Sequence, residues 1–333
     1  MNILEYTYSR LSSHSVSKEV EAQYNIGGPI SSRYYVLGLH DNYLVESVNK
    51  SYIFRIYRNS WRTEEEIIFE LELLAFLNNK TDQAAEVICT TEGDLAIQID
   101  SPEGKRMAAL FSYAEGNSPS RDISGNESML LGSTLANIHN LTDQFTTDSK
   151  RSILDLPYLL DESLIHIEKF VTSSDISFLN ELRNILYDAL SIVDDSKCDY
   201  GICIGDVNPN NFHINDNQNI TLFDFDQCGY GYRAFDIGKY FSSIGDVRNT
   251  GLIRNAFLDG YMQNSQLSHI ELEAIRYYEV VSVIWVMAIH AVNADRIGYK
   301  YLEKPFWDRR LTRLGKLAEK YLSNKFESYQ FSL

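Results

Sequence analysis

The sequence predicts an α+β fold with two lobes, a small one built on an antiparallel β-sheet and a larger one that is mainly helical. Three observations lead to this prediction. Residues 34–115 contain short segments rich in β-branched and aromatic residues, separated by turn-forming residues. From about residue 125 onward, apolar residues recur mainly at helical spacing. Residues 200–227 interrupt this helical part with a short polar hairpin.

The small lobe is expected to occupy residues 1–112 and to contain five strands and one helix. The strands are predicted at residues 34–37, 43–48, 52–57, 95–99 and 107–113. The helix is predicted at residues 63–78, because apolar residues recur at helical spacing between Ile67 and Leu77. Thr63 is a suitable N-cap, and three Glu follow it in the first turn, where negative charge stabilises a helix.

The larger lobe is expected to occupy residues 113–333 and to hold the hairpin. Helices are predicted at residues 128–139, 177–192, 268–290 and 309–323. The apolar run from Val280 to Ile289 is about half of what a bilayer requires, so it predicts a buried core helix. The hairpin strands are predicted at residues 212–214 and 220–223, joined by the turn-forming sequence NDNQN.

The composition limits the possible partners. The 333 residues are 44% hydrophobic and carry a formal charge of 30 − 46 = −16, the wrong sign for binding nucleic acid or an anionic membrane. An acidic surface suits a cationic small molecule, although it also serves solubility. The N-terminal residues do not resemble a signal peptide, and the four cysteines show no zinc-binding pattern. A cytoplasmic protein with reduced thiols is therefore expected.

Polar side chains at the ends of the hairpin strands are candidates for a catalytic and metal-binding site. Asp206 follows a short apolar run, Asn211 directly precedes the first hairpin strand, and Asp224 ends the second. A carboxylate that can take a proton, with an amide and a second carboxylate for Mg²⁺, is what phosphoryl transfer requires. The alternative is a polar hairpin whose Asp and Asn residues only form turns.

The segments GDVNPNN and LFDFDQCGYGYRAFDIGKY resemble the aminoglycoside phosphotransferase and choline kinase family, whose members have a protein-kinase-like fold. The resemblance implies that Asp206 is the catalytic base and that Asn211 and Asp224 bind Mg²⁺, assisted by Asp226. It also implies that Asp236 braces the catalytic loop.

The sequence departs from the family pattern at two positions near the implied base. Ile204 and Asn208 stand where the family usually has His. The His that Ile204 replaces generally maintains the structure of the loop. Asn208 can form hydrogen bonds but cannot carry a charge. A nucleotide-binding pseudokinase therefore remains an alternative to an active kinase.

The resemblance also implies ATP-binding residues in the small lobe. Arg55, on the strand face opposite Phe54, would bind phosphate oxygens and be held by Glu70 of the following helix. The alternatives are that Arg55 is only an exposed cation on its strand and that Glu70 is only a solvated residue of its helix. Further expected contacts are Asn42 in the phosphate-covering turn and the backbone at Phe111 and Tyr113, next to adenine.

The phosphate acceptor is the least determined part of the prediction. Acidic and aromatic residues after the hairpin favour a small cationic or polyhydroxylated molecule; they are Asp246, Glu279, Trp285, Asp295, Tyr301, Trp307 and Asp308. Homoserine, choline, sugars and aminoglycosides all remain open. The aromatic C-terminal sequence is also similar to a bacterial stress-response kinase that acts on protein Ser/Thr. His139, at the end of a predicted helix, is interpreted as structural.

Overall fold

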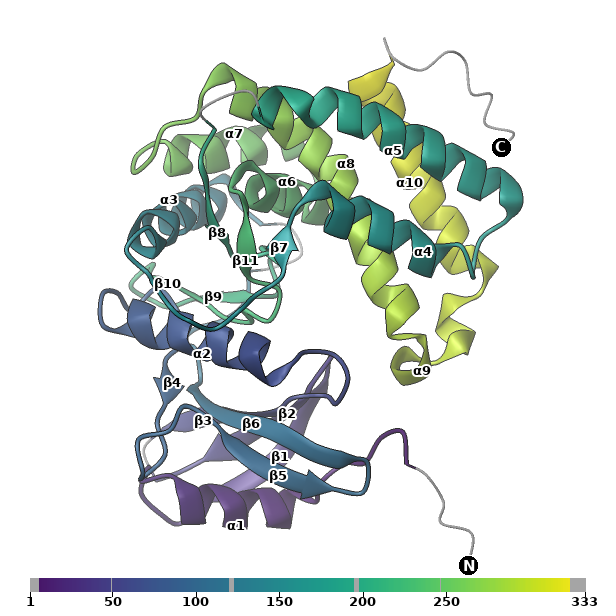
Figure 1. The fold of residues 1–333 in the computed structure, drawn as a ribbon. Coiled ribbons are helices and arrows are strands. Elements are labelled where there is room, and N and C mark those ends of the chain that lie inside the picture. Colours follow the sequence, from purple (N-terminus) through teal and green to yellow (C-terminus); the bar gives the residue numbers. More distant parts are fainter. Residues whose placement is uncertain (1–5, 49, 120–122, 195–197, 246, 324–333) are drawn as a thin grey trace, which may run out of the picture. The chain divides into compact units, whose positions relative to one another are not determined.

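The computed structural model describes residues 6–48, 50–119, 123–194, 198–245 and 247–323. The chain forms two compact units, each drawn with its labelled elements in Figure 1. The first unit comprises Met1–Ser118, Gln144–Arg151 and Phe212–Asp226. The second comprises Pro119–Asp143, Ser152–Asn211 and Gln227–Leu333.

The first unit is built on a six-stranded antiparallel sheet. Its strands are β1 (Ser31–Leu37), β2 (Asp41–Glu46), β3 (Ser51–Ile56), β4 (Val87–Ile88), β5 (Ile97–Ser101) and β6 (Gly104–Ser112). They follow the order β1-β2-β3-β6-β4, and β5 pairs with β6. Each of the five predicted strands overlaps one of these, whereas the short strand β4 was not predicted.

The alternation of side chains along β3 divides the first unit into two layers. Phe54 and Ile56 are fully buried in a core shared with Val16 and Val20 of helix α1 (Ser13–Gln23). Arg55 points to the other face, because successive strand residues alternate, and there it contacts helix α2 (Glu64–Asn78). Figure 1 shows α1 and α2 on opposite sides of the sheet.

Helix α2 begins where the sequence predicts. The Thr63 hydroxyl accepts a hydrogen bond from the Glu66 N–H, and the Glu66 carboxylate accepts one from the Thr63 N–H. This capping box satisfies two N–H groups that would otherwise lack a partner at the helix start.

The predicted hairpin is present, but it belongs to the first unit and not, as predicted from the sequence, to the larger lobe. Strands β9 (Phe212–Ile214) and β10 (Ile220–Leu222) pair antiparallel, with Phe212 opposite Leu222. Bridges from Ile214 to Asn117 and from Leu222 to Ala84 attach it to the rest of the unit. The hairpin is therefore a fixed support for the acidic residues that follow it.

The second unit is mainly helical. Its helices are α3 (Gly125–Thr142), a π-helical turn (Pro157–Glu162), α4 (Ser163–Ile167), α5 (Ser173–Asp194), α6 (Ala234–Ser243), α7 (Thr250–Tyr261), α8 (His269–Val292), α9 (Ala294–Ile297), a 3-10 turn (Tyr299–Leu302) and α10 (Lys304–Leu322). The four predicted helices correspond to α3, α5, α8 and α10. A small sheet has the order β7-β11-β8, with β7 (Ile153–Leu154), β11 (Gly229–Tyr232) and β8 (Tyr200–Cys203).

Helix α8 is long and apolar enough, by length and composition, to cross a membrane. An 18-residue window of it has a mean hydropathy of 1.4, but 72% of that window is buried inside the protein. Val280, Ile284 and Met287 have no exposed surface. This burial agrees with the core helix that the sequence predicts.

Helix α6 packs closely against α8 through a glycine. A Cβ atom on Gly238 would lie 2.8 Å from the backbone of Tyr278 and Glu279. A larger residue would push the two helices apart, so the close approach requires glycine at this position. The same helix carries Asp236 and Lys239, whose side chains reach the loop after β8.

Candidate active site

The loop that follows β8 holds Asp206 between an ammonium group and an amide. Lys239 Nζ lies 2.7 Å from Asp206 Oδ1, and Asn211 Nδ2 donates to Asp206 Oδ2 at 3.0 Å. Asn208 and Asn211 also donate to the Asp206 carbonyl oxygen. With 31% of its side chain exposed, Asp206 is fixed in orientation but accessible to a ligand.

Asp236 fixes the backbone immediately before Asp206. Its carboxylate accepts the N–H of Ile204 at 2.6 Å and the N–H of Gly205 at 2.8 Å. Gly205 has a φ of +84°, and a Cβ atom there would lie 2.1 Å from the Gln227 carbonyl oxygen. Asp236 therefore makes the contacts that the bracing role requires.

His139 is fully buried and contacts the Asp236 carboxylate. His139 Nε2 lies 3.0 Å from Asp236 Oδ2, and its Nδ1 lies 2.9 Å from the Tyr261 hydroxyl. Burial lowers the pKa of His139, although the hydrogen bond and charge of Asp236 act in the opposite direction. These contacts agree with the structural interpretation of His139.

The environment of Asp206 keeps its carboxyl group ionised at neutral pH. Burial raises the pKa of Asp206, but the charge and hydrogen bond of Lys239 and the amide hydrogen bonds outweigh it, so the pKa lies below its ordinary value. Lys239 was not predicted from the sequence. The one signal for it in the sequence is a cation in the mostly apolar stretch AFDIGKYF.

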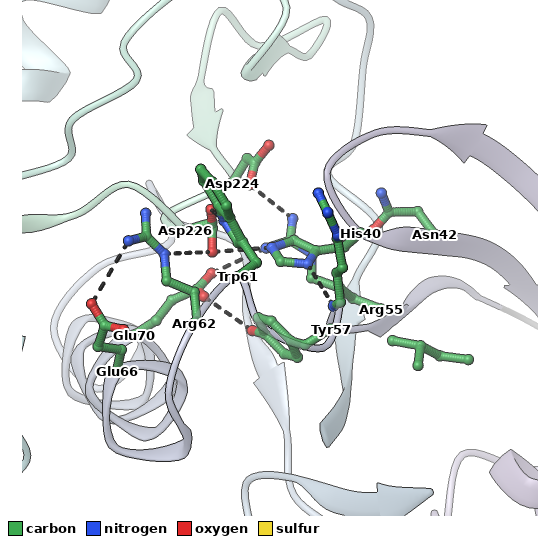
Figure 2. A network of polar contacts seen from close by, with 12 residues as sticks. His40, Asn42, Arg55, Tyr57, Trp61, Arg62, Glu66, Glu70, Asp224 and Asp226 are labelled. Atoms are coloured by element: carbon green, nitrogen blue, oxygen red, sulfur yellow. Dashed lines mark hydrogen bonds and ion pairs between the residues drawn. The ribbon is translucent and has the colours of Figure 1, made fainter. Parts of the chain in front are cut away.

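In the first unit, Arg55 connects helix α2 with the segment after the hairpin (Figure 2). Arg55 Nη1 lies 3.1 Å from Glu70 Oε1, and Arg55 Nη2 lies 3.1 Å from Asp224 Oδ1. Tyr57 donates a hydrogen bond to the second Glu70 oxygen. Burial raises the pKa of Glu70 to about 7, although the Arg55 charge opposes this shift. The predicted Arg55–Glu70 contact is thus present.

Asp224 and Asp226 differ sharply although one residue separates them. The Asp224 side chain is 40% exposed, and its backbone is left-handed, with a φ of +65°. The Asp226 side chain is 3% exposed and contacts His40 Nε2 at 3.0 Å, Trp61 Nε1 at 2.8 Å and Arg62 Nε at 3.3 Å. Figure 2 shows these donors converging on Asp226. Its carboxylate therefore holds the hairpin to the β3–α2 connection.

The remaining predicted nucleotide-binding residues belong to the sheet of the first unit. Asn42 lies in β2 opposite Arg55, and its Oδ1 accepts a hydrogen bond from Arg55 Nε at 3.3 Å. Phe111 lies in β6, with its ring 5.3 Å from the Arg55 guanidinium carbon. Tyr113 already donates its backbone N–H to Ser51, so that N–H is not available for adenine in this conformation.

Asn211 in the second unit and Asp224 in the first each carry a side-chain oxygen of the kind that a hard divalent cation prefers. Both hydrogen bonds of the Asn211 side chain are donated by Nδ2, so its carbonyl Oδ1 has no partner among the described residues. Asp224 likewise has no described partner on Oδ2. No group of three or more His, Cys, Asp or Glu that could hold a metal occurs within the described ranges. Mg²⁺ does not require one, because it is usually held by one or two protein oxygens plus phosphates.

The acidic and aromatic residues expected around the acceptor mostly have other contacts. Glu279 is buried and pairs with Arg254, Asp308 pairs with Lys304, and Asp295 accepts a hydrogen bond from Tyr299. Trp285 and Trp307 are core residues, at 3% and 2% exposure. Tyr301 is exposed, and Asp246 lies outside the described residues.

Comparison with known proteins identifies the family. The sequence profile of the phosphotransferase enzyme family (APH) matches residues 37–272. The chain belongs to this family. Membership of this family makes the protein a kinase that transfers phosphate to a hydroxyl group.

One relative and two solved structures illustrate the similarity. An uncharacterized protein of Synechocystis sp. is 37% identical over 316 residues, which are 93% of this chain and 87% of that protein. A microcompartment-associated aminopropanol kinase has a TM-score of 0.78 at 20% identity, covering 93% of this chain and 98% of the other. An amicoumacin kinase in complex with AMP-PNP and Ca²⁺ has a TM-score of 0.73 at 19% identity, covering 95% and 94%. These structures confirm the predicted protein-kinase-like α+β fold.

Proposed function

We propose that this phosphotransferase moves the γ-phosphate of ATP to a hydroxyl group of a small molecule, with Asp206 as the catalytic base. The observation that carries this proposal is the state of Asp206: ionised, partly exposed and held by Lys239 and Asn211. An acceptor hydroxyl hydrogen-bonded to this carboxylate would be oriented for attack. Structural carboxylates such as Asp226 have their oxygens covered instead.

The reaction requires one proton transfer and one exchange of bonds. The acceptor oxygen forms a bond to the γ-phosphorus, the bond to the ADP oxygen breaks, and the hydroxyl proton passes to Asp206. A carboxylate with a lowered pKa is a weak base, but phosphoryl transfer needs mainly orientation and a late proton acceptor. Lys239 would keep Asp206 charged and limit its rotation.

The residues that the family resemblance indicates are proposed to bind the nucleotide and its metal ion. Arg55, positioned by Glu70 and Asn42, would bind phosphate oxygens through its guanidinium group. Asn211 and Asp224 would supply the oxygen ligands for Mg²⁺, which neutralises phosphate charge when bound. Asp226 would assist as a metal ligand only after exchanging one of its present contacts. Phe111 and Tyr113 are proposed to lie beside adenine.

A small-molecule acceptor is supported by the names of related proteins, which include an aminopropanol kinase and an amicoumacin kinase. The notable charge of −16 favours a cationic or polyhydroxylated molecule, and transfer to protein Ser/Thr is the alternative. A cytoplasmic location is part of this proposal, since ATP is an intracellular substrate and none of the four cysteines, all within the described ranges, forms a disulfide.

Metal-dependent ATP turnover in the protein and in Asp206→Asn tests this proposal. We expect slow ATP hydrolysis that requires Mg²⁺ and falls by about 100-fold or more in the variant, the range of general-base catalysis. Calorimetric ATP binding should be retained in both proteins. Nucleotide binding without turnover in the unaltered protein would instead indicate a pseudokinase.

A further inference from the structure

The second unit contains a cavity of about 510 Å³ that is lined by residues of helices α6, α7, α8 and α10. Small-molecule sites in proteins have volumes of about 300–1,000 Å³. The apolar part of the wall comprises Phe241, Leu258, Leu272 and Ile275. The cavity is therefore large enough and apolar enough to hold the body of a small organic molecule.

The carboxylate that lines this cavity already has partners within the protein. Glu279 is 1% exposed and pairs with the Arg254 guanidinium, and the Tyr321 hydroxyl donates to its second oxygen at 2.9 Å. The Arg254 guanidinium also donates to the Phe241 carbonyl oxygen at 3.2 Å. Because both oxygens of Glu279 are in use and its charge is neutralised, this carboxylate is not available to a cationic ligand.

Two further cations line the cavity without an acidic partner. Arg276 forms no hydrogen bond or ion pair with any of the described residues, and Lys320 donates to the neutral Tyr321 hydroxyl at 2.9 Å. Both side chains are exposed. The lining thus carries a surplus of positive charge in a chain whose formal charge is −16. A local field of this sign raises the concentration of anions.

Helix geometry separates this cavity from Asp206. Lys239, whose ammonium group contacts Asp206, and Phe241, which lines the cavity, both belong to α6. Residues two positions apart in an α-helix differ by about 200° around its axis, so their side chains point to opposite sides. None of the residues proposed for catalysis, metal binding or nucleotide binding lines the cavity. A ligand bound there is therefore not the phosphate acceptor.

We propose that this cavity binds an organic anion, with an apolar body against Phe241, Leu258 and Ile275 and an acidic head group at Arg276 and Lys320. A guanidinium and an ammonium group both donate to the oxygens of such a head group. The site is separate from that of phosphoryl transfer and does not depend on the proposed function. Simple monocarboxylates are suitable probes, because they supply the head group without a hydroxyl that could accept phosphate.

Calorimetric titration of the full chain with octanoate, 3-phenylpropanoate, acetate and octylammonium tests this site. We expect both apolar acids to bind with Kd below about 1 mM. Acetate should bind at least about 30-fold more weakly than octanoate, because burying each methylene group is favourable. Octylammonium should bind at least about tenfold more weakly, because its charge meets two cations. A protein of charge −16 would otherwise attract the cation, so this order of affinities is specific to the cavity.

The double variant Arg276→Gln/Lys320→Gln removes both contacts to the head group. Kd for octanoate should rise about 5- to 30-fold, since each exposed charge contact is modest by itself. Arg309→Gln/Lys316→Gln is the matched control, because it removes one arginine and one lysine from exposed positions that do not line the cavity. The control should leave Kd within about twofold of the unaltered protein. Thermal unfolding verifies that both variants are folded.

Four outcomes would overturn the proposal. They are no detectable binding of either apolar acid, binding of octylammonium as tight as that of octanoate, equal weakening of octanoate binding in the control variant, and displacement of octanoate by AMP-PNP. The last would mean that octanoate occupies the nucleotide site. ATP turnover is not needed for any of these measurements, so a failure of the proposed function is distinguishable from a failure of this one.

Discussion

The two units of the protein each contain a buried His–Asp pair. One pair holds the main chain before Asp206, and the other holds the hairpin. His40 and Asp226 in the first unit, and His139 and Asp236 in the second, have the same 3.0 Å separation. Asp236 also accepts two backbone N–H groups, so it fixes the main chain that leads to Asp206. Asp226 accepts side-chain donors from Trp61 and Arg62, so it fixes the hairpin.

This comparison teaches that the partners of a buried carboxylate, and not the residue type, indicate its role. Asp224 and Asp226 lie in the same short segment, yet one is exposed with a single described partner and the other is covered by donors. An aspartate with an uncovered oxygen can bind a ligand. One whose oxygens are satisfied by buried donors contributes to stability.

The largest expected effect separates these two aspartates. Asp226→Ala should lower the free energy of unfolding by about 3–5 kcal/mol, because His40, Trp61 and Arg62 lose the buried carboxylate that they share. Asp224→Asn should change stability by less than about 1 kcal/mol, since the side chain is partly exposed, but lower metal-dependent turnover about 100-fold or more. Urea unfolding and steady-state kinetics measure the two effects. Equal loss of stability in both variants would remove the distinction.

An intermediate effect is expected at Lys239, which acts through Asp206. Lys239→Met should lower kcat on the order of 100-fold, because the carboxylate loses the group that orients it. KM for ATP should remain unchanged. Lys239→Arg keeps the charge and should recover part of kcat, whereas a merely structural lysine would give no such split between kcat and KM.

The smallest expected effect is the pH dependence contributed by the buried histidines. Burial lowers the pKa of both His40 and His139, so the unfolded state binds more protons below pH 6.5. Their contribution to stability is fully present above pH 6.5 and is lost as the pH falls, by up to about 1.4 kcal/mol per pH unit for each group.

Urea unfolding between about pH 7.5 and 5.5 measures this contribution by difference. Stability should fall less steeply with acidification in His139→Gln than in the unaltered protein. The difference in slope isolates His139 from Glu70, whose raised pKa acts in the opposite direction. Parallel curves for the two proteins would show that His139 is not held neutral.

The sequence was sufficient for elements with a strong local pattern. Helix α2 has apolar spacing together with a capping sequence, and the hairpin has two short apolar strands around a polar turn, so both were predicted. Helix α6 was not predicted, because residues 234–242 are all buried and therefore show no amphipathic period. Helix α1 buries only Val16 and Val20, which gives too weak a stripe.

The candidate site follows the same rule. Asp206, Asn211 and Asp224 were predicted because they flank the hairpin in sequence, and Arg55 and Glu70 because the family resemblance implies a strand cation held by a helix Glu. Lys239 was missed. Its role depends on its contact with Asp206, which lies far from it in the chain, and no local pattern records such a contact.

The most direct test of the account is the chemical identity of the phosphorylated product. The full chain is incubated with ATP and Mg²⁺ and a panel of small hydroxyl compounds, and the product is analysed by mass spectrometry and ³¹P NMR. The account predicts a phosphate ester on an alcohol oxygen of a small molecule, absent with Asp206→Asn. Phosphate found only on Ser/Thr peptides or on the protein itself would contradict the small-molecule assignment.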